Sequence, residues 1–384
     1  MASSERKLWI DVAKALCIFL VFYIHILEGF IKMGNETAYV NLRFIAAFII
    51  QIFIMLSGFV AKEPPSIKFK IFLKQKVFTR VIPIMFFNLI LVIPLLTANH
   101  SIQNIKKILK EIVGLTVGST SFNVPTWFLV CFLSMEILHF FAARYLTNMK
   151  RIVIAIVLFY TIGWLLTWQI NNIRIFGYRV LTFWYFGEAI LAYSFYLIGI
   201  AINRSGFYNK TRPVYIRLIT FSVFTLALLL TFSMNDTFFP TSYMCVDMAS
   251  YMHGNPFFFL INSIIGSLAV IALSRLMPAF KAFTYIGRNT ITLLCIDGVF
   301  YALVNYRIGS WITKHLAPLS ALSTMLICFI TAVIQFALSI PVAHFLAKYF
   351  PELLGNIKAK GIISKKATKL YLRFSKAQSS NVNT

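Results

Sequence analysis

The residues whose chemistry suits a catalytic site are concentrated in the first apolar stretch of the chain, WIDVAKALCIFLVFYIHIL (9–27), which carries Asp11, Lys14 and His25. Eleven positions separate Lys14 from His25, so a helix places both side chains on nearly the same face, roughly 16 Å apart along its axis. An imidazole titrates near neutral pH and can act as a general base. The pattern therefore predicts a histidine base about three turns from a cation that holds an anionic donor.

A purely structural interpretation of the same stretch remains open. Asp11 and Lys14 are three positions apart and can neutralise each other at a membrane interface. His25 can hydrogen-bond to a neighbouring helix without taking part in any reaction.

Small, polar and aromatic residues mark two further apolar stretches. Ser57 and Gly58 close the second stretch, where a glycine lets a backbone or a ligand come close. Trp127 lies in PTWFL (125–129) at the start of the fourth stretch, where a tryptophan is ordinarily an interfacial anchor. We predict Ser57 and Trp127 as substrate- or donor-binding candidates, with packing and anchoring as the alternatives.

Charged and polar residues also occur in the third and ninth stretches. Arg80 ends a basic loop, which can cradle the phosphates of a nucleotide-like donor or simply reflect the orientation of the chain in a membrane. Asn289 and Thr290 open the ninth stretch, and Asp297 lies inside it with no obvious local partner. An ionisable residue inside an apolar span is costly and marks a functional site by default. We therefore add Arg80, Asn289 and Asp297 to the candidate binding residues.

The sequence predicts no metal centre and no disulfide framework. Glu136 and His139 have the spacing of a helical metal motif, but they form a single copy without partner carboxylates. The cysteines are odd in number and form no CxxC pair, so we expect reduced packing residues. They are Cys17, Cys131, Cys245, Cys295 and Cys328.

Composition places the chain among polytopic membrane proteins. Of its 384 residues, 59% are hydrophobic and only 12% are charged, with a mean hydropathy of +0.79. These values exclude a soluble α/β enzyme, a disordered chain, a disulfide-rich secreted domain and a collagen-like fibre. The net charge of +24 is extreme, but anionic lipid headgroups at the cytoplasmic face are its expected partner, and nucleic acid is not.

Ten apolar stretches are long enough to span a bilayer, which needs about 20 residues each. If the N-terminus is cytoplasmic, 26 lysines and arginines fall on the cytoplasmic side and 9 on the other. This bias predicts an all-α integral membrane protein with both termini in the cytoplasm. The predicted spans are 8–30, 40–61, 78–97, 126–146, 151–170, 181–202, 214–233, 256–276, 285–305 and 322–347.

Three segments are predicted to lie outside the spans. Residues 101–113 have apolar positions at helical spacing and indicate a short helix on the outer membrane surface, or a plain amphipathic connector. Residues 234–255 form a polar external loop. The chain is thus divided into a membrane domain (1–350) and a basic, partly disordered cytoplasmic tail (351–384).

Five segments in this order resemble the acyltransferase 3 family of integral membrane O-acyltransferases. The WIDxAK opening and residues 246–255 (VDMASYMHGN) look most like the fucose 4-O-acetylase-like branch. The five segments are 9–25, 53–59 (FIMLSGF), the basic stretch to Arg80 and Pro83, 125–129, and 286–297 (IGRNTITLLCID).

The resemblance implies a ten-helix core that takes cytoplasmic acyl-CoA as co-substrate, binds no cofactor, and acylates a glycan hydroxyl on the far face. His25 matches the catalytic histidine of the family, and Arg80 matches its basic residue before the proline. Lys14 stands where the family has an arginine, and a lysine lacks the bidentate fork of that residue. Asp297 stands where the family often has a histidine.

The resulting hypothesis is acetyl transfer from acetyl-CoA to a cell-surface or lipid-linked polysaccharide, in a bacterial inner or cytoplasmic membrane. His25 removes the hydroxyl proton, and Asn289 or Thr290 donates to the developing oxyanion. An acetyl-histidine intermediate is an open alternative. The rival functions are a transporter or flippase for a glycan-related substrate, and a scaffold or sensor without chemistry.

Overall fold

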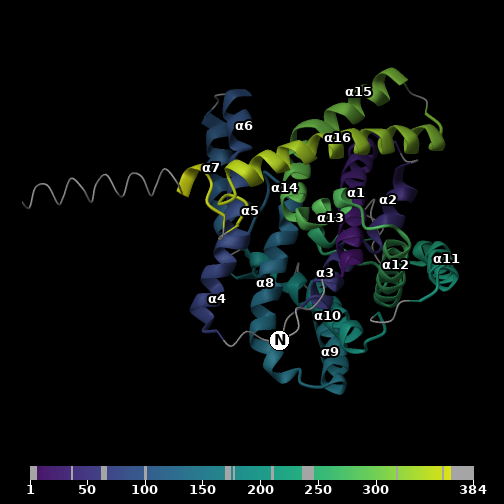
Figure 1. Ribbon diagram of the computed structural model, residues 1–384. Coiled ribbons are helices and arrows are strands. Elements are labelled where there is room, and N and C mark those ends of the chain that lie inside the picture. Colours follow the sequence, from purple (N-terminus) through teal and green to yellow (C-terminus); the bar gives the residue numbers. More distant parts are fainter. Residues whose placement is uncertain are drawn as a thin grey trace, which may run out of the picture.

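The computed structural model describes residues 7–35, 38–61, 67–98, 102–168, 174–175, 178–208, 212–235, 246–316, 319–356 and 359–364. Helices account for almost all of its regular structure, with one antiparallel pair of two-residue strands (Figure 1). The helices are α1 (Leu8–Ile31), α2 (Tyr39–Ala46), α3 (Ile49–Phe59), α4 (Phe69–Lys76), α5 (Ile82–Leu89), α6 (Val92–Ala98), α7 (Ile102–Thr116), α8 (Trp127–Ala142), α9 (Met149–Trp168), α10 (Phe186–Arg204), α11 (Val214–Thr231), α12 (Pro256–Leu276), α13 (Lys281–Arg288), α14 (Thr290–Phe300), α15 (Tyr306–Leu316) and α16 (Ala321–Tyr349).

Shorter elements join these helices. Two are π-helical turns that continue a span: η2 (Val77–Val81) and η8 (Tyr301–Asn305). The others are the 3₁₀ turns η3 (Val124–Thr126), η4 (Ala143–Tyr145), η5 (Val180–Tyr185), η6 (Phe232–Met234) and η7 (Met248–Ser250), and the strands β1 (Arg174–Ile175) and β2 (Tyr178–Arg179).

Among the described residues, ten helical stretches are long and apolar enough to cross a membrane, which confirms the predicted all-α membrane fold. Eight of them begin and end within three residues of the predicted bounds. The third begins at Phe69 rather than 78, because the polar helix α4 runs into η2 and α5 without a break. The ninth begins at Thr290 rather than 285, because the separate helix α13 ends at Arg288, and it ends at Leu316 rather than 305, because η8 joins α14 to α15.

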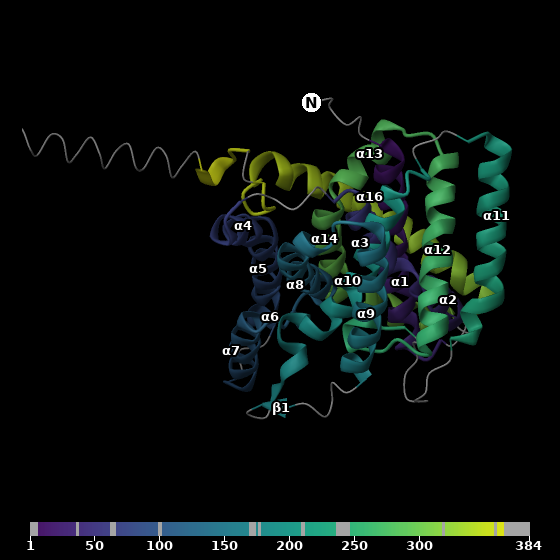
Figure 2. The ribbon, with the colours of Figure 1, turned by 90° about the horizontal axis from the view of Figure 1, so that it is seen from below.

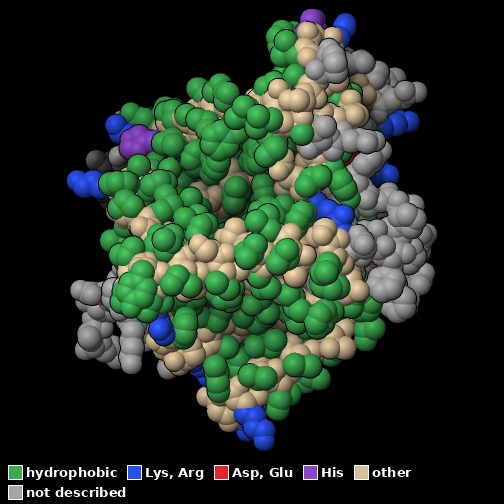
Figure 3. Space-filling view, turned by 90° about the vertical axis from the view of Figure 1, so that its right-hand side faces the viewer, with side chains coloured by type: hydrophobic (Ala, Val, Ile, Leu, Met, Phe, Trp, Pro, Cys, Tyr) green, Lys and Arg blue, Asp and Glu red, His purple; other side chains and the backbone are tan. Residues whose placement is uncertain are grey.

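Burial separates a lipid-facing shell from the centre of the bundle. Only 6% of the most apolar 18-residue segment of α11 is buried, and Leu226 and Leu230 on that helix are more than half exposed. Hydrophobic side chains cover most of one face of the molecule, as expected for a surface that contacts lipid (Figure 3). In contrast, 72% of the corresponding segment of α1 is buried, because α1 packs against α3, α12, α13, α14, α15 and α16. The helix with the candidate base is therefore the centre of the fold.

Helices α3 and α10 cross with their backbones in contact. A Cβ atom on Gly58 would lie 1.9 Å from the carbonyl oxygen of Tyr196, and one on Gly199 would lie 2.0 Å from that of Met55. Only glycine leaves room for this approach, as in other close membrane helix pairs. The expectation that Gly58 admits a neighbouring backbone is confirmed.

A Gly58→Ala variant should therefore lose thermal stability in detergent, with an overpacking cost of about 1–3 kcal/mol. The matched control is Gly114→Ala on α7, where the new Cβ would lie 3.2 Å from a side-chain atom of Ser119. A thermal melt of both variants checks the packing. Equal melting temperatures would contradict it.

The described chain begins and ends at the same end of the bundle, as an even number of spans requires (Figure 2).

Helix α7 confirms the helix predicted near residues 101–113. Within the described residues Cys17, Cys131, Cys295 and Cys328 are buried free thiols, as predicted. Cys245, residues 236–245 of the predicted external loop and residues 365–384 of the predicted tail lie outside the described residues.

Candidate active site

The centre of the bundle holds a histidine–carboxylate pair. A hydrogen bond joins His25 Nδ1 on α1 to Asp297 Oδ2 on α14, across 272 positions of sequence. The Asp297 side chain is fully buried, and the His25 side chain is 15% exposed. The sequence indicated no local partner for Asp297, and the structure supplies that partner from a distant helix.

A cavity of about 60 Å³ opens beside His25 and is walled by α1, α3, α8 and α14. Trp127 and Thr290 line it, so the structure brings these two sequence candidates together with His25. Val21 and Ile18 also line it, respectively one and two turns before His25 on α1. The cavity therefore extends from His25 toward the end of α1 that carries Lys14. The rest of its wall is mainly apolar and includes Phe53 and Phe128.

Three other predicted residues do not line this cavity. The Ser57 hydroxyl donates to the carbonyl oxygen of Phe53 in its own helix at 2.8 Å. The Asn289 amide donates to the carbonyl oxygen of Tyr285 at 2.8 Å and thereby closes the end of α13. Lys14 is half-buried on α1, two turns before Val21. The Ser57 and Asn289 side chains thus hydrogen-bond to backbone carbonyl oxygens four positions earlier in the chain.

The acidic neighbour Asp11 ties the start of α1 to α13. Its carboxylate lies 3.6 Å from the Nε of Arg288. A Cβ on the preceding Gly287 would lie 2.0 Å from the backbone oxygen of Asp11, so the two helices touch closely here. An ion pair and a close backbone contact thus fix the start of α1 against α13.

Arg80 belongs to a separate ion-pair cluster. Its Nε and Nη2 donate to the two carboxylate oxygens of Glu136 at 3.2 and 3.1 Å, and Lys76 donates to the same carboxylate at 2.6 Å. The guanidinium also lies over the ring of Phe132, 5.3 Å from its centre. Phe132 packs against Phe128 of the cavity wall, with the ring centres 5.8 Å apart. Arg80 is therefore two aromatic rings away from the cavity.

Glu136 and His139 have the spacing of a metal motif but bond to different partners in the structure. His139 Nδ1 bonds to the Tyr193 hydroxyl at 3.0 Å instead of joining Glu136 at a metal. No group of three histidine, cysteine or acidic side chains that could hold a metal occurs in the part of the chain that the structure describes.

Sequence reasoning missed Tyr301, Glu28 and Lys32, which interact with one another next to His25. The Tyr301 ring stands edge-on to the imidazole, with the ring centres 5.0 Å apart. Its hydroxyl accepts a hydrogen bond from Lys32 Nζ at 2.8 Å and is hydrogen-bonded to Glu28. Glu28 and Lys32 follow His25 by three and seven positions. That helical spacing was the available signal.

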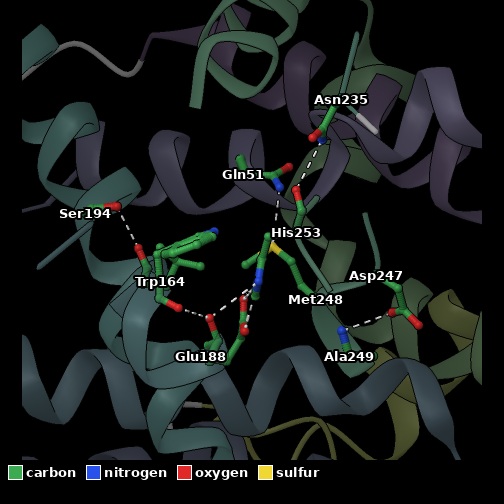
Figure 4. Close-up of polar contacts among 11 residues, drawn as sticks. Gln51, Trp164, Glu188, Ser194, Asn235, Asp247, Met248, Ala249 and His253 are labelled. Carbon is green, nitrogen blue, oxygen red and sulfur yellow. Dashed lines mark hydrogen bonds and ion pairs between the residues drawn. The ribbon is translucent and has the colours of Figure 1, made fainter. Parts of the chain in front are cut away.

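A second buried histidine–carboxylate pair lies between α10 and the 246–255 loop. Its members are Glu188 and His253, which point toward each other (Figure 4). His253 Nε2 lies 3.0 and 3.1 Å from the carboxylate oxygens of Glu188. Asn235 donates to the backbone carbonyl of His253 at 3.2 Å. The sequence placed His253 in a polar loop and assigned it no partner.

Buried amides fix the start of α8 against α14. The Asn123 side chain donates to the carbonyl oxygen of Cys295 at 2.9 Å, two residues before Asp297. Its backbone N–H donates to Asn88, whose amide also donates to the Thr126 hydroxyl at 2.9 Å. Because Thr126 directly precedes Trp127, this network holds the tryptophan of the cavity wall in register with the His25–Asp297 pair.

Comparison with known proteins agrees with this architecture. The family model described as "Acyltransferase domain", that of the acyltransferase 3 family, matches residues 7–341, well over half of the chain. No curated protein and no solved structure matches the chain. With ten spans and this match, the chain belongs to the acyltransferase 3 family and is a multi-pass membrane protein.

Proposed function

We propose that this protein transfers an acetyl group, or another short acyl group, from cytoplasmic acyl-CoA to a hydroxyl of a cell-surface or lipid-linked polysaccharide sugar. The observation that carries the proposal is the His25–Asp297 pair at the edge of a narrow apolar cavity. Asp297 would not be retained fully buried in a membrane core without a paired cation or a function.

The proposed reaction uses the imidazole as a proton shuttle. Asp297 engages Nδ1, so Nε2 is the nitrogen that accepts the proton of the acceptor hydroxyl. The hydroxyl oxygen attacks the thioester carbonyl, a C–O bond forms, and the C–S bond breaks. The imidazolium then returns its proton to the thiolate and leaves free CoA. The buried carboxylate stabilises the imidazolium during the step.

The shape of the cavity supports the proposed donor side. It runs from His25 toward Lys14 and is walled mainly by apolar groups. A cavity of about 60 Å³ suits the small acyl end of the thioester, and its direction leads the pantetheine arm of CoA toward Lys14. Thr290 lines the cavity and supports an oxyanion role better than Asn289, whose amide is bonded to Tyr285.

The basic cluster around Arg80 supports a phosphate-binding role at some distance from the thioester. Lys76 and Arg80 carry two positive charges against the single charge of Glu136. The surplus charge attracts a CoA phosphate, which must compete with the Glu136 carboxylate for the guanidinium.

Charge supports the proposed orientation and location, and sequence resemblance supports the proposed acceptor. The positive-inside bias supports cytoplasmic termini and contact with anionic lipids, and hence a plasma-membrane location. The resemblance of 9–25 and 246–255 to the fucose 4-O-acetylase-like branch supports a glycan acceptor.

A Lys14→Ala variant should raise the KM for acetyl-CoA roughly tenfold, because hydrogen bonds to charged groups contribute about 1.5–3 kcal/mol, and should leave kcat nearly unchanged. Lys14→Arg, which restores the residue typical of the family, should keep the KM low. Steady-state kinetics in membranes check this. An unchanged KM in Lys14→Ala would remove Lys14 from the donor site.

The function itself is tested by supplying labelled acetyl-CoA to membranes with and without the protein. We expect base-labile label in the surface polysaccharide only when the protein is present, together with loss of the O-acetyl NMR signal from cells that lack it. Equal O-acetylation in both strains would overturn the proposal.

A further inference from the structure

Acidic side chains gather beyond His25, at the end of α1 that carries Glu28. Asp247 interacts electrostatically with Glu28 and with Tyr301, whose ring contacts His25. Asp247 also interacts electrostatically with Tyr185, and its carboxylate accepts a hydrogen bond from the backbone N–H of Ala249 at 3.1 Å. Lys32, whose charge also acts on Glu28, donates a hydrogen bond to the Tyr301 hydroxyl. This region is acidic although the chain carries a net charge of +24.

Three aromatic rings lead from the cavity into this acidic region. Trp127 lines the cavity and packs on Tyr185, with the ring centres 5.5 Å apart. Tyr185 in turn stacks on Tyr251 at 5.6 Å and an interplanar angle of 16°. We call Trp127, Tyr185 and Tyr251 the aromatic ladder. Both tyrosines are half-buried.

The backbone is strained where it presents the two tyrosines. Three non-glycine residues in the described ranges have a positive φ, and two of them are Tyr185 at 53° and Tyr251 at 61°. Such conformations persist only where the surroundings enforce them, and they cluster at functional sites.

The Glu188–His253 pair enforces this arrangement. Glu188 follows Tyr185 by three residues, and His253 follows Tyr251 by two, so the buried pair clamps the two chain segments that carry the stacked rings. The backbone bridge between Asp247 and Met252 closes the turn around Tyr251. The pair therefore has a positioning role, which explains a buried histidine–carboxylate contact that the acyl-transfer step does not use.

We propose that the aromatic ladder, together with Asp247 and Glu28, forms the acceptor subsite, an inference that rests on the proposed function. This subsite takes an uncharged sugar. The apolar face of a sugar ring fits against an aromatic ring, and its hydroxyls donate hydrogen bonds to carboxylates. The negative charge of Asp247 disfavours uronic acids, sialic acids and sugar phosphates, so the subsite selects by repulsion as well as by contact. The hydroxyl nearest Trp127 is presented to His25.

The first test identifies the acceptor by its charge. Surface polysaccharide from cells that carry the protein is deacetylated with mild base and incubated with wild-type membranes and labelled acetyl-CoA. The product is hydrolysed under conditions that retain O-acetyl groups and is fractionated by anion exchange. We expect the label in the uncharged sugars. Label in anionic sugars would overturn the inference but leave acyl transfer intact, whereas no transfer by the wild type would overturn both.

The second test addresses the ladder. Tyr251→Leu should raise the KM for the deacetylated polysaccharide about three- to tenfold, the loss expected for one aromatic contact, without changing the KM for acetyl-CoA. Tyr251→Phe keeps the ring and should behave as the wild type. Tyr215→Leu on the lipid-exposed face of α11 is the matched control. An unchanged acceptor KM in Tyr251→Leu, or a parallel rise in both KM values, would exclude the ladder from the acceptor subsite.

Discussion

A His25→Ala variant should transfer acyl groups about 10²–10⁴-fold more slowly than the wild type, the range that a general base contributes. The loss should fall on kcat rather than on the KM for acetyl-CoA, because the imidazole acts on the acceptor hydroxyl and not on the CoA phosphates. The measurement is the initial rate of labelled acetyl transfer in membranes that contain equal amounts of protein.

Folding must be separated from chemistry in this experiment, because removing His25 leaves the buried Asp297 carboxylate without its partner. His25→Asn provides a second variant that can still donate a hydrogen bond to Asp297 and should be equally inactive. His344→Ala is the matched control, since His344 lies in a span but is exposed and outside the cavity. Wild-type rates in both His25 variants would show that His25 is only structural.

Asp297→Asn should also reduce kcat, by about 10²–10⁴-fold. The substitution keeps the size of the side chain, but an amide can donate to Nδ1 and so favour the tautomer with a proton on Nε2, which cannot accept the proton of the hydroxyl. A comparable substitution in serine proteases costs about 10⁴-fold for this reason. The KM for acetyl-CoA should stay unchanged. The check is a full kinetic comparison with Glu352→Gln, which alters a carboxylate beyond the last helix.

Activity within about threefold of the wild type in Asp297→Asn would contradict the orienting role of the carboxylate. A large loss of thermal stability without loss of kcat per folded molecule would instead assign Asp297 to packing. In the proposed mechanism Asp297 and His25 act as one unit, so the double variant should be little slower than either single variant.

The spans were predictable because their signal is local. Twenty consecutive apolar residues leave a helix as the only way to satisfy the backbone in lipid, and eight of the ten spans were placed within three residues. The two larger errors arose where α4 and α15 add polar helical turns to an apolar run. A hydropathy profile alone does not detect polar helical turns that extend an apolar span.

The candidate site was predictable only where one helix carries the pattern. His25 stood out because Lys14 lies on the same helix at a fixed spacing, and Trp127 and Thr290 stood out at helix starts. Asp297 was noticed as a costly residue, but its bond to His25 depends on how α14 packs on α1, which no local spacing encodes. For the same reason the Arg80–Glu136 and Glu188–His253 pairs appear only in the fold.

The most direct measurement is a structure of the protein with a non-hydrolysable acetyl-CoA analogue. The acceptor hydroxyl oxygen must lie about 2.6–3.2 Å from His25 Nε2 to give up its proton, and about 3–3.5 Å from the acyl carbonyl carbon to attack it. The carbonyl carbon must therefore lie within roughly 6 Å of His25 Nε2. We expect it there, with the pantetheine arm running past Ile18 toward Lys14. An analogue bound with its acyl group outside the cavity walled by α1, α3, α8 and α14 would contradict this mechanism.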